Sequence, residues 1–305
     1  MLYYKMKISF FFISLLLMYS CSQETKQKIE NINEEKTHRS SNELIHNSLF
    51  SKQLNRSWNV MIYLPPHYYT DSLKHFDVLY LLHGHGGNET SWMGSVEIKS
   101  MVDNLILSDS IKDFIIVMPD GGNSWFVDGF EKMESAIIKD LLPNIYKNFR
   151  INQNFESTSI GGMSAGGYGS LRFVLKYPDL FQNAILMSPA SYFPFPDQTS
   201  FARSDVASFR DKTGGFSNSK WTAYNYPNYW KTFDQAKKLP HHFYLSVGTS
   251  DGFTGIIKAV NEQLRIELNK RKEKITYQVK NYNGGHEMNV WKQALKSAIL
   301  KIYKK

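Results

Sequence analysis

Short apolar runs alternate with amphipathic stretches along the chain from about residue 44 to the C-terminus. Continuous apolar runs bounded by turn residues are typical of strands buried on both faces of a sheet. They predict strands at Trp58–Leu64, Phe76–Leu82, Phe114–Met118, Ser157–Gly161, Ala184–Met187, Phe243–Val247 and Ile275–Val279. Helical spacing predicts helices at Val96–Leu107, Glu131–Tyr146, Tyr168–Lys176, Ile256–Asn269 and Val290–Tyr303. Strands alternating with helices predict an α/β fold with a mainly parallel sheet.

The N-terminus has a different pattern. Met1–Lys7 carries two lysines, and Ile8–Ser20 is an apolar run that ends at Cys21. About 20 apolar residues are needed to cross a bilayer, so this run is short for a permanent span. A basic start, a short apolar middle and a small residue before the cleavage point predict a secretory signal peptide over residues 1–20.

Leu17–Cys21 (LMYSC) resembles the lipobox of bacterial lipoproteins, and Cys21 is the one cysteine of the sequence. The resemblance implies cleavage before Cys21 and lipid attachment to its thiol, and hence an extracytoplasmic protein anchored to a bacterial membrane. The alternatives are an ordinary signal peptide with an incidental cysteine, or an uncleaved anchor. Residues 21–43 are polar, which predicts a flexible tether before the folded domain of residues 44–305.

Composition and charge exclude several classes of protein. With 305 residues and 42% hydrophobic content, the chain can form a large core, so a disordered protein is excluded. A single cysteine excludes an intrachain disulfide and a cysteine-based zinc site. The net charge is +8, but the basic clusters have neither interleaved aromatic residues nor a recognition helix, so we expect no nucleic-acid partner.

A candidate nucleophile follows the strand at Ser157–Gly161. In parallel sheets, ligands gather at the carboxyl ends of the strands. Here the sequence reads Gly162-Met163-Ser164-Ala165-Gly166 and continues into a helix, which is the strand–turn–helix setting of a G-x-S-x-G nucleophile elbow. The alternative is that the glycines only form a tight turn.

A serine nucleophile needs a base within hydrogen-bond reach, and on this fold the order along the chain is Ser, acid, His. His286 lies in a glycine-containing loop after the last predicted strand and is the candidate base, although a surface or helix-capping histidine would also fit there. His241 and His242 begin a strand at its amino end, which is the opposite edge of the sheet.

The candidate acid is Asp251, in the turn after Phe243–Val247. It would accept the Nδ1 hydrogen of His286 and stabilise the imidazolium. Because aspartate in such a turn often only caps the backbone, Asp197 and Asp205, after the preceding strand, are alternatives.

Backbone donors for an oxyanion are expected at two places. The elbow supplies the N–H of Ala165, and the loop after Phe76–Leu82 (HGHGGN) supplies the other, at His85 or, if the loop is shifted, at Gly86. His83 and His85 could instead bind a metal, but the next residues offer no carboxylate or further ligand. We therefore expect neither a metal nor another cofactor.

Five ordered segments resemble the esterase D / tributyrin esterase group of α/β-hydrolases, which includes feruloyl and acetyl-xylan esterases of carbohydrate esterase family 1. They are LLHGHGGNETSW (Leu81–Trp92), MPDGGNSWF (Met118–Phe126), GGMSAGGYGSL (Gly161–Leu171), VGTSDG (Val247–Gly252) and GGHEMNVW (Gly284–Trp291). The resemblance implies an α/β-hydrolase catalytic domain from Leu44 onward, with a Ser164–Asp251–His286 triad and backbone donors at His85 and Ala165. Where the group often has an aromatic residue two positions after the histidine, this chain has Met288, which leaves the triad intact but changes the local pocket wall. The related S-formylglutathione hydrolases are disfavoured, because a secreted protein would rarely meet that cytosolic thioester.

Two further regions are expected near Ser164. Trp125 and Asn123 follow Phe114–Met118 and would line the substrate site, unless Trp125 serves only in packing. The segment around 190–235 has little periodicity but many aromatic residues, which predicts a cap insertion over the site. Its aromatic rings would stack on sugars or phenolic acids, or else pack the cap onto the domain.

Together these features predict a secreted, lipid-anchored serine carboxylesterase that acts on small-molecule or polysaccharide esters, such as acetyl or feruloyl esters of plant polysaccharide. One alternative is acyl transfer to a sugar hydroxyl, which product analysis with excess acceptor would detect. Another is a non-catalytic carbohydrate-binding protein with the same hydrolase fold. If a fluorophosphonate failed to label Ser164, that result would indicate this alternative.

Overall fold

Eight strands form one sheet at the centre of the folded domain. The structure is a computed structural model that describes residues 44–305 except residue 253, without the side chains of residues 253–261. The predicted signal peptide, the predicted lipid-attachment residue Cys21 and the predicted tether lie outside the described residues. Among the described residues, no helix is both long enough and apolar enough to span a bilayer.

The sheet has the order β1-β2-β4-β3-β5-β6-β7-β8. The strands are β1 Leu44–Ser51, β2 Arg56–Tyr63, β3 Asp77–Leu82, β4 Phe114–Pro119, β5 Thr158–Met163, β6 Asn183–Met187, β7 His241–Gly248 and β8 Ile275–Tyr282. Strand β2 is antiparallel to β1 and to β4, and every other neighbouring pair is parallel. The prediction of an α/β fold with a mainly parallel sheet is therefore confirmed.

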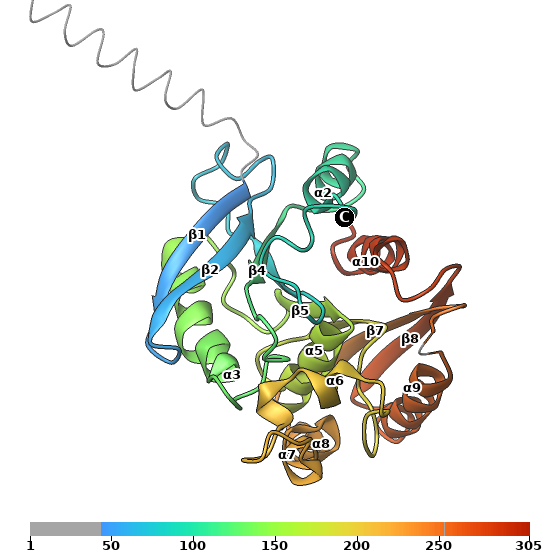
Figure 1. Ribbon diagram of the computed structural model, residues 1–305. Coiled ribbons are helices and arrows are strands. Elements are labelled where there is room, and N and C mark those ends of the chain that lie inside the picture. Colours follow the sequence, from blue (N-terminus) through green and yellow to red (C-terminus); the bar gives the residue numbers. More distant parts are fainter. Residues whose placement is uncertain (1–43, 253) are drawn as a thin grey trace, which may run out of the picture. The chain divides into compact units, whose positions relative to one another are not determined.

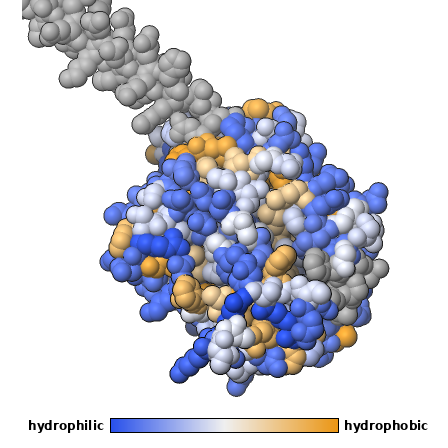
Figure 2. Space-filling view, viewed as in Figure 1, coloured by the Kyte–Doolittle hydropathy of each residue, from blue (hydrophilic) through white to orange (hydrophobic). Residues whose placement is uncertain are grey.

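Helices cover both faces of this sheet (Figure 1). They are α2 Ile98–Leu107, α3 Met133–Ala136, the π-helical turn η1 Ile137–Leu141, α4 Leu142–Asn148, α5 Ala165–Lys176, α9 Thr254–Asn269 and α10 Met288–Ile302. Successive side chains of a strand point to opposite faces of the sheet, so each strand contributes to two hydrophobic cores, one on each face. Leu79 and Leu81 of β3 pack with α2 and α10, whereas Val78 and Tyr80 pack with the helices of the opposite face. Hydrophilic side chains cover much of the face seen in Figure 2.

The predicted cap consists of five short helical segments between β6 and β7, drawn in yellow and orange in Figure 1. They are α6 Phe201–Ser204, the 3₁₀ turn η2 Ala207–Phe209, α7 Asn218–Tyr224, the 3₁₀ turn η3 Tyr226–Tyr229 and α8 Trp230–Phe233. Phe209 and Trp221 are completely buried and pack against Trp125 and Tyr168 of the main domain. Most aromatic side chains of the cap thus attach it to the domain.

Candidate active site

Ser164 occupies a sharp turn between β5 and α5. Its φ is 53° and its ψ is −114°, a conformation that residues with a side chain rarely adopt. The turn is held by the backbone, since the N–H of Ser164 donates to the carbonyl of Met187 at 2.8 Å and its carbonyl accepts from Ala190 at 3.0 Å. The hydroxyl is therefore presented at the carboxyl end of the sheet by a strained but well-anchored turn.

The glycines around Ser164 are required by close backbone contacts. A Cβ at Gly162 would lie 2.5 Å from the carbonyl carbon of Gly166, and a Cβ at Gly166 would lie 2.5 Å from the carbonyl oxygens of Leu82 and His83. These distances are far shorter than van der Waals contact. The small residues thus allow α5 to start directly against the end of β3, which brings Ser164 beside the loop that follows β3.

The side chains of Ser164, His286 and Asp251 form a continuous hydrogen-bonded series. Nε2 of His286 lies 3.0 Å from Oγ of Ser164, and Nδ1 lies 2.9 Å from Oδ2 of Asp251. Asp251 follows β7, and His286 follows β8 immediately before α10. The three residues, separated by as many as 122 positions, meet because each one follows a parallel strand at the same edge of the sheet.

This series fixes the hydrogen on the imidazole ring. A carboxylate can only accept, so the neutral ring carries its hydrogen on Nδ1 and presents the lone pair of Nε2 to the hydroxyl of Ser164. The side chain of Asp251 is fully buried, while that of His286 is 21% exposed. The indole of Trp291 packs edge-on against the imidazole at 5.0 Å and limits its rotation.

The two predicted oxyanion donors are the N–H group of His85, in the loop after β3, and that of Ala165, at the start of α5. Among the described residues, the N–H groups of His85 and Ala165 donate no hydrogen bond to another residue. The neighbouring N–H of Gly86 differs, because it donates to Oδ1 of Asn123 at 2.8 Å. The geometry thus favours His85 over Gly86 as the available donor of this loop.

His83 holds the loop after β3 in place through hydrogen bonds at both ring nitrogens. Its Nε2 accepts from the N–H of Gly121 at 2.8 Å, and its Nδ1–H donates to the carbonyl of Gly84 at 2.6 Å. Burial lowers the pKa of His83, which keeps the ring neutral as this pair of bonds requires. Both ring nitrogens are therefore occupied, and the described residues contain no group of three or more histidine, cysteine or acidic side chains placed to hold a metal ion.

The structure also places the other predicted residues. Trp125 is 3% exposed and belongs to the aromatic cluster beneath the cap, while one edge of it reaches the cavity described below. Asn123 is exposed and binds the loop after β3. Their role in substrate binding remains a prediction. Of the two alternative acids, Asp197 accepts from Thr199 within its own turn, and Asp205 binds the His85 side chain.

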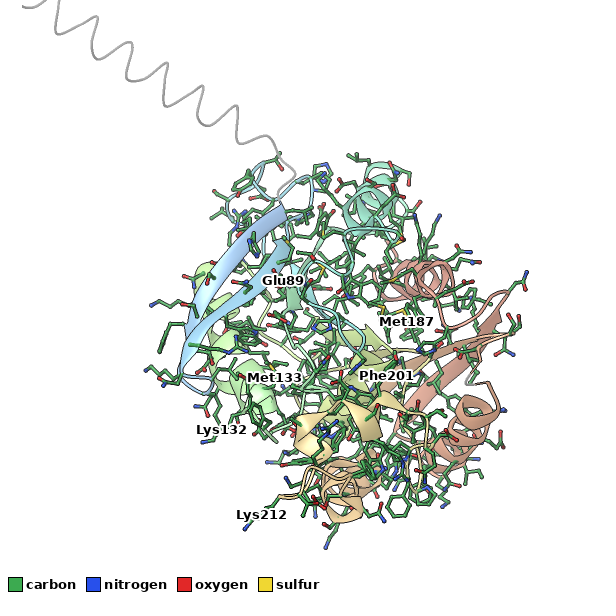
Figure 3. The ribbon with its side chains drawn as sticks, in the orientation of Figure 1. Glu89, Lys132, Met133, Met187, Phe201 and Lys212 are labelled. Carbon is green, nitrogen blue, oxygen red and sulfur yellow. The ribbon has the colours of Figure 1, made fainter. Side chains whose placement is uncertain are left out.

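A cavity of about 270 Å³ contains Ser164 and His286. Its other side chains are mostly aromatic or thioether groups, including Trp125, Tyr192, Phe201, Trp291, Met163 and Met288. In the described part of the chain, no lysine, arginine, aspartate or glutamate lines it. Figure 3 labels Phe201 near the middle of the molecule, whereas Lys212 of the same cap lies at its outer edge. The cavity therefore suits an uncharged and partly apolar group.

Sequence reasoning missed the contacts that bring the cap to this cavity. Tyr192, Ser200 and Phe201 line the cavity, and Asp205 contacts the loop after β3. The aromatic enrichment of the segment was the one available signal, and it did not distinguish the residues that face the cavity from those that pack beneath the cap.

Comparison with known proteins gives a consistent result. The family model Esterase matches residues 51–302. An endo-1,4-beta-xylanase/feruloyl esterase of Xylanibacter ruminicola is 32% identical over 156 residues, which cover 48% of this chain and 22% of that protein. An acetyl esterase of Caldicellulosiruptor saccharolyticus is 30% identical over 152 residues, covering 47% of this chain and 54% of the relative. The fold of fluorophosphonate-binding serine hydrolase F of Staphylococcus aureus superposes with a TM-score of 0.69 at 20% identity, covering 87% of this chain and 99% of that one.

Proposed function

Because the chain belongs to the Esterase family, we propose that it is a serine carboxylesterase that hydrolyses carboxylic esters through an acyl-enzyme. The observation that carries the proposal is the bonded series from Asp251 through His286 to Ser164, with distances of 2.9 and 3.0 Å. A base next to a serine hydroxyl, oriented by a buried acid, is the arrangement that activates serine as a nucleophile.

The first half of the reaction forms the acyl-enzyme. Oγ of Ser164 attacks the ester carbonyl while Nε2 of His286 takes the hydroxyl proton. The negative charge that develops on the carbonyl oxygen is stabilised by the N–H groups of His85 and Ala165. The intermediate collapses when the C–O bond to the alcohol breaks, and the imidazolium of His286 gives its proton to the departing oxygen. The acyl group is then bound to Ser164.

The second half regenerates the enzyme. His286 accepts a proton from water as the water oxygen attacks the acyl carbonyl, and the same two N–H groups stabilise the second oxyanion. When the bond to Oγ breaks, His286 returns the proton to Ser164 and the carboxylic acid is released. Asp251 stays ionised throughout and stabilises the imidazolium in each half. Every catalytic group in this reaction belongs to the chain, and the reaction needs no cofactor.

We propose acetyl or feruloyl esters of plant polysaccharide as the substrate class. Two observations support this choice. The described residues that line the cavity are mostly aromatic or thioether-bearing and include no lysine, arginine, aspartate or glutamate, and two relatives bear the names endo-1,4-beta-xylanase/feruloyl esterase and acetyl esterase. Hydrolysis rates for methyl ferulate, acetylated xylan and a short-chain triglyceride test the choice, and a clear preference for the triglyceride would contradict it.

We further propose that the mature protein is extracytoplasmic and attached to a bacterial membrane through lipid on Cys21. The apolar run before Cys21 and its likeness to a lipobox support this proposal. In a bacterial host, the wild-type protein should incorporate labelled palmitate and sediment with membranes, and Cys21→Ser should do neither. If both proteins sedimented with membranes to the same extent and neither incorporated labelled palmitate, the lipid anchor would be contradicted.

The catalytic proposal is tested with Ser164→Ala and p-nitrophenyl acetate. Removing Oγ should abolish turnover while thermal unfolding stays close to that of the wild type. Ser110→Ala, which changes an exposed serine after α2, is the matched control and should retain full activity. Wild-type turnover in the Ser164 variant would refute the mechanism.

A further inference from the structure

A carboxylate of the cap lies against the loop that carries the proposed oxyanion donor. Oδ2 of Asp205, the residue directly after α6, lies 3.0 Å from Nε2 of His85 and 3.0 Å from Nδ2 of Asn123. Asp205 and Asn123 are 82 positions apart. The reaction proposed above does not use this carboxylate, which is 55% exposed and does not line the cavity.

The contact between Asp205 and His85 has a defined polarity. The indole N–H of Trp125 lies 3.2 Å from Nδ1 of His85, and an indole N–H can only donate. Nδ1 is therefore the acceptor, and the neutral ring carries its hydrogen on Nε2, which faces the carboxylate of Asp205. The imidazole of His85 thus accepts a hydrogen bond from the main domain at Nδ1, while its Nε2 lies in contact with the carboxylate of the cap.

The hydrogen bond between Asp205 and Asn123 acts on Gly86, the residue that follows His85. Oδ1 of Asn123 accepts from the N–H of Gly86 at 2.8 Å, which leaves Nδ2 to donate to Asp205. Asp205 therefore holds both residues of the dipeptide, His85 through its ring and Gly86 through the amide of Asn123. The N–H of His85 lies in this dipeptide, so its direction depends on both attachments.

The cap supplies a third contact to this loop. The ring of Phe201, at the start of α6, stacks on the imidazole of His85 with centroids 4.7 Å apart and planes 11° from parallel. The segment is anchored to the domain by Ala202 and Val206, which are completely buried. A short, anchored helical turn thus presents an aromatic face and a carboxylate to the same side chain.

We propose that Asp205 is a positioning residue for the oxyanion site, through which the cap fixes the direction of the His85 N–H. The inference rests on the proposed esterase function. An oxyanion donor stabilises the transition state only when it is held close to its productive position, and small displacements weaken this stabilisation. Because Asp205 does not touch the substrate cavity, its loss should lower kcat and leave KM nearly unchanged.

Two substitutions at Asp205 separate hydrogen bonding from charge. Nε2 of His85 and Nδ2 of Asn123 lie against the same oxygen, so the amide oxygen of Asp205→Asn can still accept from Asn123 and contact His85, whereas Asp205→Ala removes both contacts. We expect kcat to fall about tenfold or more in Asp205→Ala, which is less than the roughly hundredfold loss when an oxyanion donor is removed outright. Asp205→Asn should recover most of this loss. Asp211→Asn removes the same charge from an exposed turn of the cap and should leave kcat and KM unchanged.

A double-mutant cycle tests whether Asp205 acts through the loop. In a His85→Ala, Asn123→Ala background, the further change Asp205→Ala should have little effect on kcat, because its partners are already absent. The rate of Ser164 modification by a fluorophosphonate should follow the same order as kcat in all variants. Thermal unfolding of each variant checks that the cap remains folded.

The outcomes separate this inference from the proposed function. If the wild type hydrolyses esters and Asp205→Ala matches its kcat, or if the Asn and Ala variants lose equal activity, the positioning role is refuted and the esterase function stands. An additive loss in the His85→Ala, Asn123→Ala background would also refute it. If the wild type neither hydrolyses esters nor reacts with a fluorophosphonate, the proposed function fails, and the positioning role fails with it.

Discussion

The carboxylate of Asp251 lies 2.9 Å from Nδ1 of His286, and its side chain is fully buried. The amide of Asp251→Asn is not an ionised acceptor, so it no longer selects the tautomer of His286 that carries its hydrogen on Nδ1. Nε2 then has no lone pair with which to accept the hydroxyl proton of Ser164. We predict a fall in kcat of roughly 10⁴-fold for p-nitrophenyl acetate. Asp197→Asn, which changes the exposed alternative acid, should stay near the wild-type rate, and activity retained in the Asp251 variant would contradict the assignment.

Gly166 provides a prediction about the turn that carries Ser164. A Cβ at this position would lie 2.5 Å from two carbonyl oxygens at the end of β3, so Gly166→Ala must shift α5 or β3. We expect a lower midpoint of thermal unfolding and loss of esterase activity. A Cβ at Gly94 meets nothing within 4 Å, which makes Gly94→Ala the matched control with both properties unchanged. Equal unfolding midpoints for the two variants would contradict this account of the turn.

Arg172 of α5 forms a buried ion pair with Glu134 of α3 at 2.8 Å, with side chains that are 1% and 2% exposed. Arg172 also donates to the carbonyls of Phe126 and Tyr224, so it joins the loop after β4 to the cap. Its loss would leave buried acceptors without a partner, and Arg172→Met should lower the free energy of unfolding by about 3–5 kcal/mol.

The control is Arg265, which forms an ion pair with Glu262 in which both side chains are exposed. Arg265→Met should change the free energy of unfolding by less than about 1 kcal/mol. Urea titrations at pH 7 measure both values. Similar losses for the two variants would show that burial of the Arg172 pair has no particular energetic role.

The burial of two histidines leads to a prediction of how the free energy of unfolding depends on pH. Burial lowers the pKa of His83 and of His241 in the folded protein, so the unfolded chain binds protons first as the pH falls. Their contribution to stability is complete above the unfolded value, about pH 6.5, and is lost as the pH falls toward the lower folded values. The free energy of unfolding should thus decrease from pH 7 to pH 5. His241→Gln should show a shallower decrease, and an identical slope in both proteins would contradict the prediction.

Most of the sheet could be predicted because burial on both faces produces continuous apolar runs. All seven predicted strands and all five predicted helices correspond to elements of the structure. Strand β1 was missed because His46, Asn47 and Ser48 interrupt its apolar residues. Only Leu49 and Ser51 are buried in it, so it has no apolar run. The cap helices were missed individually because each has three to seven residues, too few for helical periodicity to emerge.

The site could be predicted only as far as its residues follow strands. Ser164 comes directly after a parallel strand, and Asp251 and His286 lie in the loops that follow two others, so topology places all three at the carboxyl ends of the strands. The contact between Asp205 and His85 has no such signal, since it depends on how the cap lies against the domain. Tertiary packing of aromatic side chains such as Trp221 determines that position, and no spacing rule encodes it.

The central claim is that Ser164 is a nucleophile activated by His286. Treatment with one equivalent of a fluorophosphonate, followed by proteolysis and mass spectrometry of the peptides, tests it most directly. The account predicts that the phosphonyl group is attached to Ser164, that activity is lost in proportion, and that His286→Ala reacts far more slowly. Loss of activity with Ser164 unmodified and the label on another residue would contradict it.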